Sequence, residues 1–305
     1  MAGDQHSAFG DLLRRHRLVA GLSQQALAER AGISVDAVAA LERGRRRSPR
    51  AFTVRVLADT LGLGQAQLEQ LVEVAKATAG GQRGRAPRAP APVTPLVGRA
   101  AERDAVAALL RQDGYRLVTL TGPGGVGKTQ LALAVARRVA DDFPDGIGWA
   151  PLALLDGADA LTQAVASAFG VREKPGNAVL DSLTEQIAAR DQLLVLDNCE
   201  HLASACAALV DRLLAEVAGL RVLATSRERL RLAAEVVRPV TSLPVPRGRH
   251  RDDLEHSPAA HLFVQRARQL VPYFEIAPGD EPALVRICQE LDGLPLAIEL
   301  AAARS

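Results

Sequence analysis

Residues 116–136 read RLVTLTGPGGVGKTQLALAVA, and this stretch indicates how the larger part of the chain folds. Leu117–Thr121 is a short run of apolar and β-branched residues, which predicts a buried strand. Apolar residues recur at helical spacing from Leu131 to Ala136, which predicts a helix. Between the two, Gly122–Thr129 reads GPGGVGKT and has the full spacing of a phosphate-binding P-loop.

The residue types of this loop suit a nucleoside triphosphate. Glycines allow backbone N–H groups to approach phosphate closely, and the N-terminus of the following helix adds partial positive charge. We predict that Lys128 bridges the β- and γ-phosphates of ATP and that Thr129 ligates Mg²⁺. The alternative, a glycine-rich turn without a nucleotide, does not account for the strand, the lysine and the helix together. The predicted nucleotide contacts of the loop are Gly122, Gly124, Gly125, Val126, Gly127, Lys128, Thr129 and Gln130.

A second buried strand, Gln192–Asp197, ends in a carboxylate. Asp197 is therefore the predicted partner of Mg²⁺, directly or through water. Asn198 follows at a position where a second acid would polarise the attacking water, and an amide can orient water but cannot accept its proton. Glu200 could take that role instead. We therefore predict slow ATP turnover.

A third strand, Leu220–Thr225, is followed two residues later by Arg227. A cation at the end of a strand could sense the γ-phosphate, and the alternative is an ordinary pair with an acid. For Cys199 and His201, partial burial and loop polarity are favoured over a catalytic role.

Strands and helices alternate through this part of the chain. Ile147–Leu155 predicts a further strand, and Ala160–Ala168 and Leu180–Ala189 predict apolar helices. Such alternation is typical of an α/β fold with a doubly wound parallel sheet, here that of a P-loop NTPase.

The N-terminal region instead predicts an all-α domain of five short helices. Ser23 and Ser34 are predicted N-caps of the second and third helices, which are joined through Gly32 in a helix-turn-helix arrangement. The five helices are predicted near Leu12–Val19, at Gln24–Ala31, Val35–Arg43, Phe52–Leu61 and Gln65–Ala77. The predicted apolar stripe of the first consists of Leu12, Leu13, Leu18 and Val19.

Proline, glycine and arginine dominate residues 79–95, which we interpret as an extended linker. The expected domains are therefore residues 1–78, the linker, a nucleotide-binding domain over 96–257, and a helical lid over 258–305. Residues 1–90 contain 14 Lys and Arg against eight Asp and Glu. A basic first domain favours a polyanionic partner, and a solvated basic surface is the alternative.

Composition excludes several classes of protein. Hydrophobic residues make up 48% and charged residues 24%, as in ordinary globular domains. Charged or amide side chains interrupt every apolar run, so no membrane helix is expected, and the N-terminus lacks the pattern of a secretion signal. Three scattered cysteines form neither a disulfide framework nor a zinc site. We expect a cytoplasmic protein.

Leu22–Arg50, LSQQALAERAGISVDAVAALERGRRRSPR, resembles the phage-repressor (XRE-type) DNA-binding domain. The resemblance implies that the third helix enters the major groove of double-stranded DNA and that Gln24 holds a phosphate. Ser34, Val35, Asp36 and Ala40 would face base edges, where their side chains encode little base specificity. The implied backbone-contacting arginines are Arg43, Arg45, Arg46, Arg47 and Arg50. A helical bundle that binds protein is the alternative.

Five motifs over residues 95–305 resemble the STAND class of signalling ATPases, close to the NB-ARC switches and to actinobacterial ATPase regulators. They are LVGRAAERDAVAALL, GPGGVGKTQLALAVA, LLVLDNCEHL, VLATSRERL and CQELDGLPLAIELAAAR. The resemblance implies that Val97 and Arg99 line the adenine side of the nucleotide, that Arg227 is the sensor, and that Pro295 closes over the base. It implies a lid after Pro258 whose inward-facing residues are Leu262, Val264, Ala267 and Leu270.

Together these features predict a transcription factor controlled by ATP, ADP and Mg²⁺. ATP would drive self-association, and clustering would raise the effective concentration of the DNA-binding domains. The resemblance also implies a winged-helix module and sensing repeats after residue 305, through which an unknown inducer would act. One alternative is a signalling or defence scaffold whose helical domain binds protein. A second is an ATP-hydrolysing enzyme with a separate substrate, for which the sequence offers no second catalytic constellation.

Overall fold

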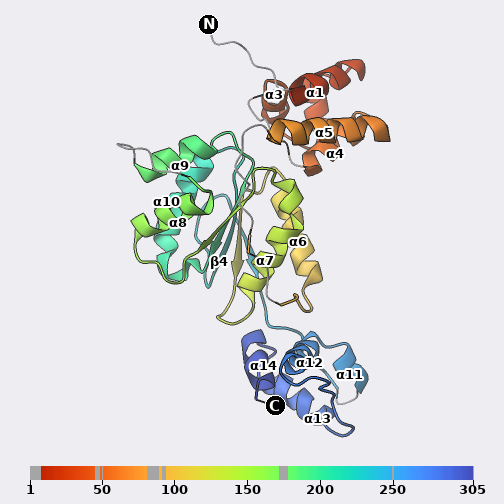
Figure 1. Cartoon of the computed structure of the whole chain (residues 1–305), viewed down its shortest axis with the longest axis vertical. Helices are drawn as coiled ribbons and strands as arrows, with labels where there is room; N and C mark the ends of the chain where they lie inside the picture. The colour runs from red at the N-terminus through yellow and green to blue at the C-terminus, as the bar shows by residue number, and fades with distance from the viewer. Residues whose placement is uncertain are drawn as a thin grey trace.

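A five-stranded parallel sheet forms the middle of the molecule (Figure 1). The strands lie in the order β2-β3-β4-β1-β5. Their bounds are β1 Leu117–Thr121, β2 Ile147–Pro151, β3 Leu193–Asp197, β4 Arg221–Ser226 and β5 Glu235–Pro239. The computed structural model describes residues 8–44, 49, 51–80, 89–90, 94–171, 178–248 and 251–304. The predicted doubly wound parallel sheet is confirmed.

Helices cover both faces of the sheet, as the continuous apolar strands require. The helices α6 (Ala100–Arg111) and α7 (Lys128–Arg138) lie on one face, followed by the short 3₁₀ turn η1 (Ala140–Asp142). The opposite face carries α8 (Ala158–Ala168), α9 (Val179–Ile187) and α10 (Ala203–Glu216), with the 3₁₀ turn η2 (Cys199–Leu202) before α10. Each face buries its own hydrophobic core.

The edge strand β5 has no counterpart among the predicted strands. It pairs with β1 in parallel, but its residues are half-buried or exposed and it ends at Pro239. Half-exposed edge strands lack the long apolar run of a central strand, and proline is accepted there because its missing N–H faces away from the ladder.

Five helices form the N-terminal region, as predicted, around a separate hydrophobic core. They are α1 (Ala8–Val19), α2 (Gln24–Ala31), α3 (Val35–Glu42), α4 (Ala51–Thr60) and α5 (Gln65–Gly80). The predicted caps are confirmed, because the hydroxyls of Ser23 and Ser34 accept hydrogen bonds from Ala26 N and Ala37 N at 3.0 and 3.1 Å.

The predicted apolar stripe of α1 is wrong in its second half. Leu13 is buried and Leu12 packs at the edge of the core, but Leu18 and Val19 are 59% and 83% exposed. Phe9 takes their place in the core, and Arg17 occupies the buried position one turn after Leu13. The inward face of α1 therefore includes the Arg17 cation, and the spacing of apolar residues gives no sign of a buried arginine.

The C-terminal helices form a third unit beside the carboxyl end of the sheet (Figure 1). They are α11 (Arg251–Glu255), α12 (Pro258–Leu270), α13 (Glu281–Glu290) and α14 (Pro295–Ala302), and they share one core. Ala267 is buried and Leu262 and Val264 pack against this core as predicted, but Leu270 at the end of α12 is half exposed. Among the helices that the structure describes, none has the length and apolar character needed to cross a bilayer.

Candidate functional site

The P-loop connects the carboxyl end of β1 to α7. Gly127 has φ 95° immediately before the first helical residue, Lys128, and this left-handed conformation favours glycine. A Cβ atom at Gly122 would lie 2.5 Å from the carbonyl oxygen of Val240, so no other residue fits there without a shift of the backbone. Val126 is buried in the core, which leaves only its backbone to face a ligand. Thr129 and Gln130 are exposed on the first turn of α7.

Lys128 is folded back onto this loop. Its Nζ donates to the carbonyl oxygens of Gly122 and Pro123 at 2.8 and 3.0 Å, and the side chain is largely buried. Burial lowers the pKa of the Lys128 ammonium and nearby Arg227 lowers it further, whereas Glu200 and Asp197 act in the opposite direction. The lysine is therefore held within the loop that is predicted to bind the phosphates of the nucleotide, which Lys128 is itself predicted to contact.

Asp197, the last residue of β3, contacts the first turn of α7 directly after the P-loop. The Thr129 hydroxyl donates to Asp197 Oδ1 at 2.8 Å, and the Thr225 hydroxyl donates to the same oxygen at 2.6 Å. The hydroxyl of Thr129 and the carboxylate of Asp197 are hard oxygen donors of the kind that Mg²⁺ prefers. The described residues contain no group of three or more His, Cys, Asp or Glu that could hold a metal alone. This donor set fits Mg²⁺ shared with phosphates, where the ion would neutralise charge on the β- and γ-phosphates.

Arg227 and Glu200 form an ion pair at 3.3 Å between Nε and Oε1. The Arg227 side chain is 66% exposed, whereas Glu200 Oε2 is buried and has no hydrogen-bond partner in the part of the chain that the structure describes. Asn198 has φ 71°, a left-handed turn that carries the chain from β3 into η2 and brings Glu200 towards the P-loop. The structure thus brings Lys128, Asp197, Glu200 and Arg227 to one end of the sheet.

Arg99 lies behind the P-loop. It is 3% exposed, and its guanidinium donates to the carbonyl oxygens of Val126 and Thr241 at 3.0 and 2.6 Å. The side chain therefore braces the loop against the segment that follows β5. Val97 is half-buried two residues earlier. The bracing contacts of Arg99 are long-range, and the sequence carries no signal for them.

The C-terminal helical unit touches the P-loop through the start of α14. The N–H of Leu296 donates to the carbonyl oxygen of Gly125 at 3.2 Å. A Cβ atom at Gly127 would lie 3.9 Å from Pro295 Cγ, so the proline sits directly against the loop. Pro295 is therefore next to the candidate nucleotide site, on the side of the C-terminal helices.

Cys199 and His201 lie in η2, directly after Asn198. Cys199 is buried in the core, where its hydrogen bond with Cys206 and its burial raise the pKa of the thiol. His201 is exposed, and its Nε2 lies 3.1 Å from the carbonyl oxygen of Leu155.

The structure describes some of the residues predicted to contact DNA and leaves others out. Arg45, Arg46, Arg47 and Arg50 lie outside the described residues. Val35, Asp36 and Arg43 are exposed on and beside α3 and Ala40 is half-buried, while the Ser34 hydroxyl is used as the cap. Gln24 Nε2 donates to the buried carboxylate of Glu42 at 2.7 Å, so part of its hydrogen-bonding capacity is already used inside the domain.

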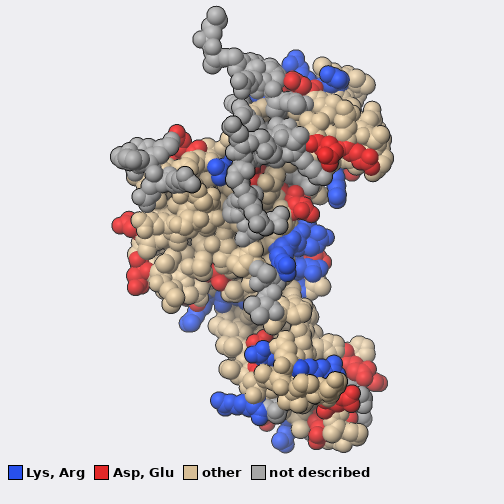
Figure 2. Space-filling model, in the orientation of Figure 1, with Lys and Arg blue, Asp and Glu red and all other residues tan. Residues whose placement is uncertain are grey.

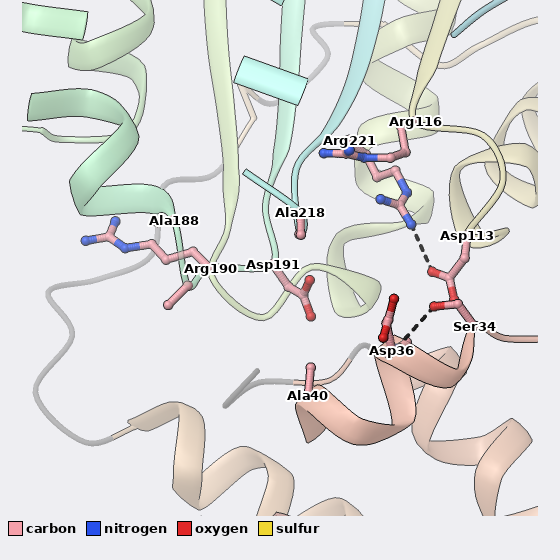
Figure 3. A pocket seen from close by; sticks show the side chains of 13 residues that line it. Ser34, Asp36, Ala40, Asp113, Arg116, Ala188, Arg190, Asp191, Ala218 and Arg221 are labelled. Atoms are coloured by element: carbon pink, nitrogen blue, oxygen red, sulfur yellow. Dashed lines mark hydrogen bonds and ion pairs between the residues drawn. The ribbon is translucent and has the colours of Figure 1, made fainter. Parts of the chain in front are cut away.

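One face of α3 lines a cavity of about 500 Å³ (Figure 3). Ser34, Asp36, Ala37 and Ala40 form its wall on the helix-turn-helix side. The opposite wall comes from the amino ends of the strands and includes Asp113, Arg116, Arg190, Asp191, Gly219 and Arg221. Arg221 Nη2 donates to Asp113 Oδ1 at 2.9 Å across this wall. Three of the four residues predicted to face base edges, Ser34, Asp36 and Ala40, thus line a cavity at the end of the sheet opposite the P-loop, whereas Val35 is not among its lining residues.

Two parts of the chain match known families. Residues 8–71 match a helix-turn-helix domain, and residues 100–242 match the NB-ARC domain. A protein of Mycobacterium tuberculosis (strain ATCC 25618 / H37Rv), named as a candidate HTH-type transcriptional regulator, is 44% identical over 197 residues. An uncharacterized protein of the same strain is 40% identical over 213 residues.

These relatives are much longer than the part that matches. The first alignment covers 65% of this chain and 21% of the relative, and the second covers 70% and 51%. The chain therefore matches about a fifth of one relative and about half of the other.

Solved structures show a looser likeness. A STAND protein with a tetratricopeptide repeat sensor from Pyrococcus horikoshii has a TM-score of 0.44 at 17% identity, over 70% of this chain and 30% of that protein. A Walker-type ATPase of Pyrococcus abyssi has a TM-score of 0.45 at 16% identity, over 68% of this chain and 67% of that protein.

Proposed function

We propose that this chain, which joins a helix-turn-helix domain to an NB-ARC domain, is a cytoplasmic transcriptional regulator switched by ATP and ADP. The observation that carries the proposal is the cluster at the carboxyl end of the sheet. A P-loop lysine, a threonine–aspartate pair suited to Mg²⁺ and an arginine–glutamate pair lie there together. The backbone N–H of Leu296 in the lid helix α14 contacts the same loop, so a nucleotide bound there would influence the position of the lid.

Slow hydrolysis suits such a switch. Asn198 stands where a second acid would activate water, and Glu200, the other carboxylate near Lys128, is paired with Arg227. A γ-phosphate would compete for Arg227 and release Glu200 to act on water. We expect turnover well below the median enzyme rate of about 10 s⁻¹, measured as phosphate release at steady state.

The orientation of α3 supports control of DNA binding. A recognition helix enters a major groove about 12 Å wide and about 8.5 Å deep, and the face that reads bases must be open to the duplex. The cavity beside Ser34 and Ala40 has room for a small molecule but not for DNA. DNA binding therefore requires α3 to leave the sheet end of the NB-ARC domain. ATP-driven self-association would then present several such helices together.

Sedimentation with ADP and with a non-hydrolysable ATP analogue, each with and without duplex DNA, tests the proposal. We expect larger assemblies with the ATP analogue and DNA binding in that state. Equal sedimentation in both nucleotides would contradict the switch.

Cross-linking tests the closed orientation of α3. The three native cysteines, Cys199, Cys206 and Cys288, are buried, so Ala40→Cys combined with Ala189→Cys offers selective reaction with a reducible bismaleimide. We expect the cross-linked protein to bind duplex DNA at least about tenfold more weakly, which corresponds to a loss of about 1.4 kcal/mol in binding free energy. Reduction should restore affinity. Unchanged binding by the cross-linked protein would show that DNA does not need this face, and Ala40→Cys alone is the control.

Contact of the arginine-rich segment after α3 with the DNA phosphate backbone is tested by Arg45→Ala with Arg46→Ala. We expect weaker binding to all sequences alike and a log–log salt slope smaller by about two, since each phosphate contact contributes about one. Figure 2 shows another group of basic side chains over α6 and α7. Of the arginines on these two helices, Arg103 and Arg138 pair with Asp104. Arg103→Ala is therefore the control and should leave the slope unchanged. A changed base preference in the double variant would assign these arginines to base recognition.

A second candidate function is a scaffold whose helical domain binds protein. The apolar side chains of Val35 and Ala40 on α3 favour it, because they offer bases no hydrogen bonds. Binding to random duplex without salt dependence, or no binding at all, would support the scaffold over the regulator.

A further inference from the structure

Thr225 lies at the end of β4, and its hydroxyl makes two hydrogen bonds with the end of β3. The side chain is 1% exposed. Its Oγ1 donates to Asp197 Oδ1 at 2.6 Å and accepts from the N–H of Asn198 at 2.9 Å. One buried hydroxyl therefore joins the carboxylate predicted to meet Mg²⁺ to the left-handed turn that follows it.

The sheet places this residue. The strands β3 and β4 pair in parallel with Leu196 opposite Ala224, so the next residue on each strand is Asp197 and Thr225. Arg227 follows Thr225 by two residues, and Glu200 follows Asn198 by two. Thr225 is thus positioned between the metal carboxylate, the sensor arginine and the segment that carries Glu200.

Both threonine hydroxyls of the site donate to the same carboxylate oxygen. Thr129 Oγ1 lies 2.8 Å and Thr225 Oγ1 lies 2.6 Å from Asp197 Oδ1. Charge-assisted O–H···O⁻ bonds of this length are among the strong hydrogen bonds of proteins. Two hydroxyls that donate to Oδ1 restrict the rotation of the carboxylate, which would then be held ready to meet a cation or its bound water.

We propose that Thr225 is a positioning residue for the Mg²⁺ site, which acts through Asp197 and through the turn at Asn198. The proposal rests on the nucleotide binding proposed above. Groups that orient a metal ligand contribute about 10- to 100-fold to metal affinity. Removing the hydroxyl should therefore weaken the response to Mg²⁺ and leave metal-independent nucleotide contacts in place.

The test uses the full chain with Thr225→Val, which keeps the shape and removes the hydroxyl, and Thr225→Ser, which keeps the hydroxyl. Binding of a fluorescent ADP is measured first in EDTA and then during a Mg²⁺ titration. We expect Thr225→Val to bind ADP normally in EDTA but to need about 10- to 100-fold more Mg²⁺ for half of the effect. Thr225→Ser should lie close to the wild type.

Thr119→Val is the matched control. Thr119 is also fully buried, on the adjacent strand β1 opposite Ala224, but its hydroxyl has no hydrogen-bond partner in the described structure. The control should leave the Mg²⁺ titration unchanged. A normal Mg²⁺ titration for Thr225→Val would overturn the proposed role of the hydroxyl, and so would an equally weakened Mg²⁺ response in the valine and serine variants. Neither result would contradict the proposed function. A wild type that binds no ADP, or binds it without any effect of Mg²⁺, would overturn the proposed function as well.

Discussion

Lys128→Ala is expected to reduce the affinity for ATP about 10- to 100-fold and to reduce hydrolysis by a larger factor. Hydrogen bonds to charged groups contribute about 1.5–3 kcal/mol, and Lys128 Nζ already lies at the loop, within reach of the Gly122 and Pro123 carbonyl oxygens. Cations that stabilise charge on a transferring phosphoryl group contribute a further 10²–10³ or so in rate. Calorimetry with ATP and Mg²⁺ and a single-turnover assay measure the two effects separately.

The matched control is Arg137→Ala, which removes an exposed cation from the last turn of the same helix, α7. It should leave both nucleotide affinity and assembly unchanged. At nucleotide concentrations that saturate the wild type but not Lys128→Ala, the variant should also lose the nucleotide-dependent change in sedimentation. If assembly and DNA affinity persisted in that variant, the nucleotide would not be the switch, whatever its affinity.

The local motifs were the most predictable part of this molecule. The phosphate loop could be located from the sequence because each of its residues serves a local need. Glycine is required where the backbone is left-handed at Gly127, and the lysine and threonine follow it on the first turn of α7. Asp197 was predictable for a similar reason, since a carboxylate at the end of a buried strand lies at the carboxyl end of a parallel sheet.

Contacts between distant segments were not predictable. Thr225 reaches Asp197 only because β4 lies beside β3, and an apolar run does not reveal its neighbour in the sheet. Arg99 binds carbonyl oxygens 27 and 142 residues away. Its place in a motif was recognisable, but its bracing of the P-loop depends on tertiary structure. The strand β5 was missed because its half-exposed residues form only a short apolar signal.

The misjudged face of α1 has a specific cause, the buried ion pair of Arg17 and Glu42. Arg17 Nε donates to Glu42 Oε1 at 2.6 Å and Nη2 donates to Oε2 at 2.9 Å, while Nη1 donates to the Leu22 carbonyl oxygen at 2.8 Å. Both side chains are almost fully buried. The pair joins α1 to the end of α3, the predicted recognition helix.

Glu42→Leu should therefore destabilise the helix-turn-helix domain by about 3–5 kcal/mol, because it leaves the Arg17 guanidinium buried without its counter-ion. Thermal unfolding of residues 1–80, whose helices have their own core, measures the change. The control is Arg17→Met with Glu42→Leu, which removes both charges and should recover most of the loss. A double variant no more stable than Glu42→Leu would show that packing, and not the unpaired charge, accounts for the effect.

The same pair gives the domain a pH dependence with a definite sign. Burial alone would raise the pKa of Glu42, but hydrogen bonds from Arg17 and Gln24 and the charges of Arg17 and Arg14 hold it below its ordinary value. A carboxyl whose pKa is lower in the folded state stabilises that state above its unfolded pKa of about 4.3, and the contribution is lost as pH falls through the folded value. The wild-type fragment should thus lose stability below about pH 4 more steeply than the double variant. Parallel curves for the two would mean that Glu42 is not the group responsible for the pH dependence.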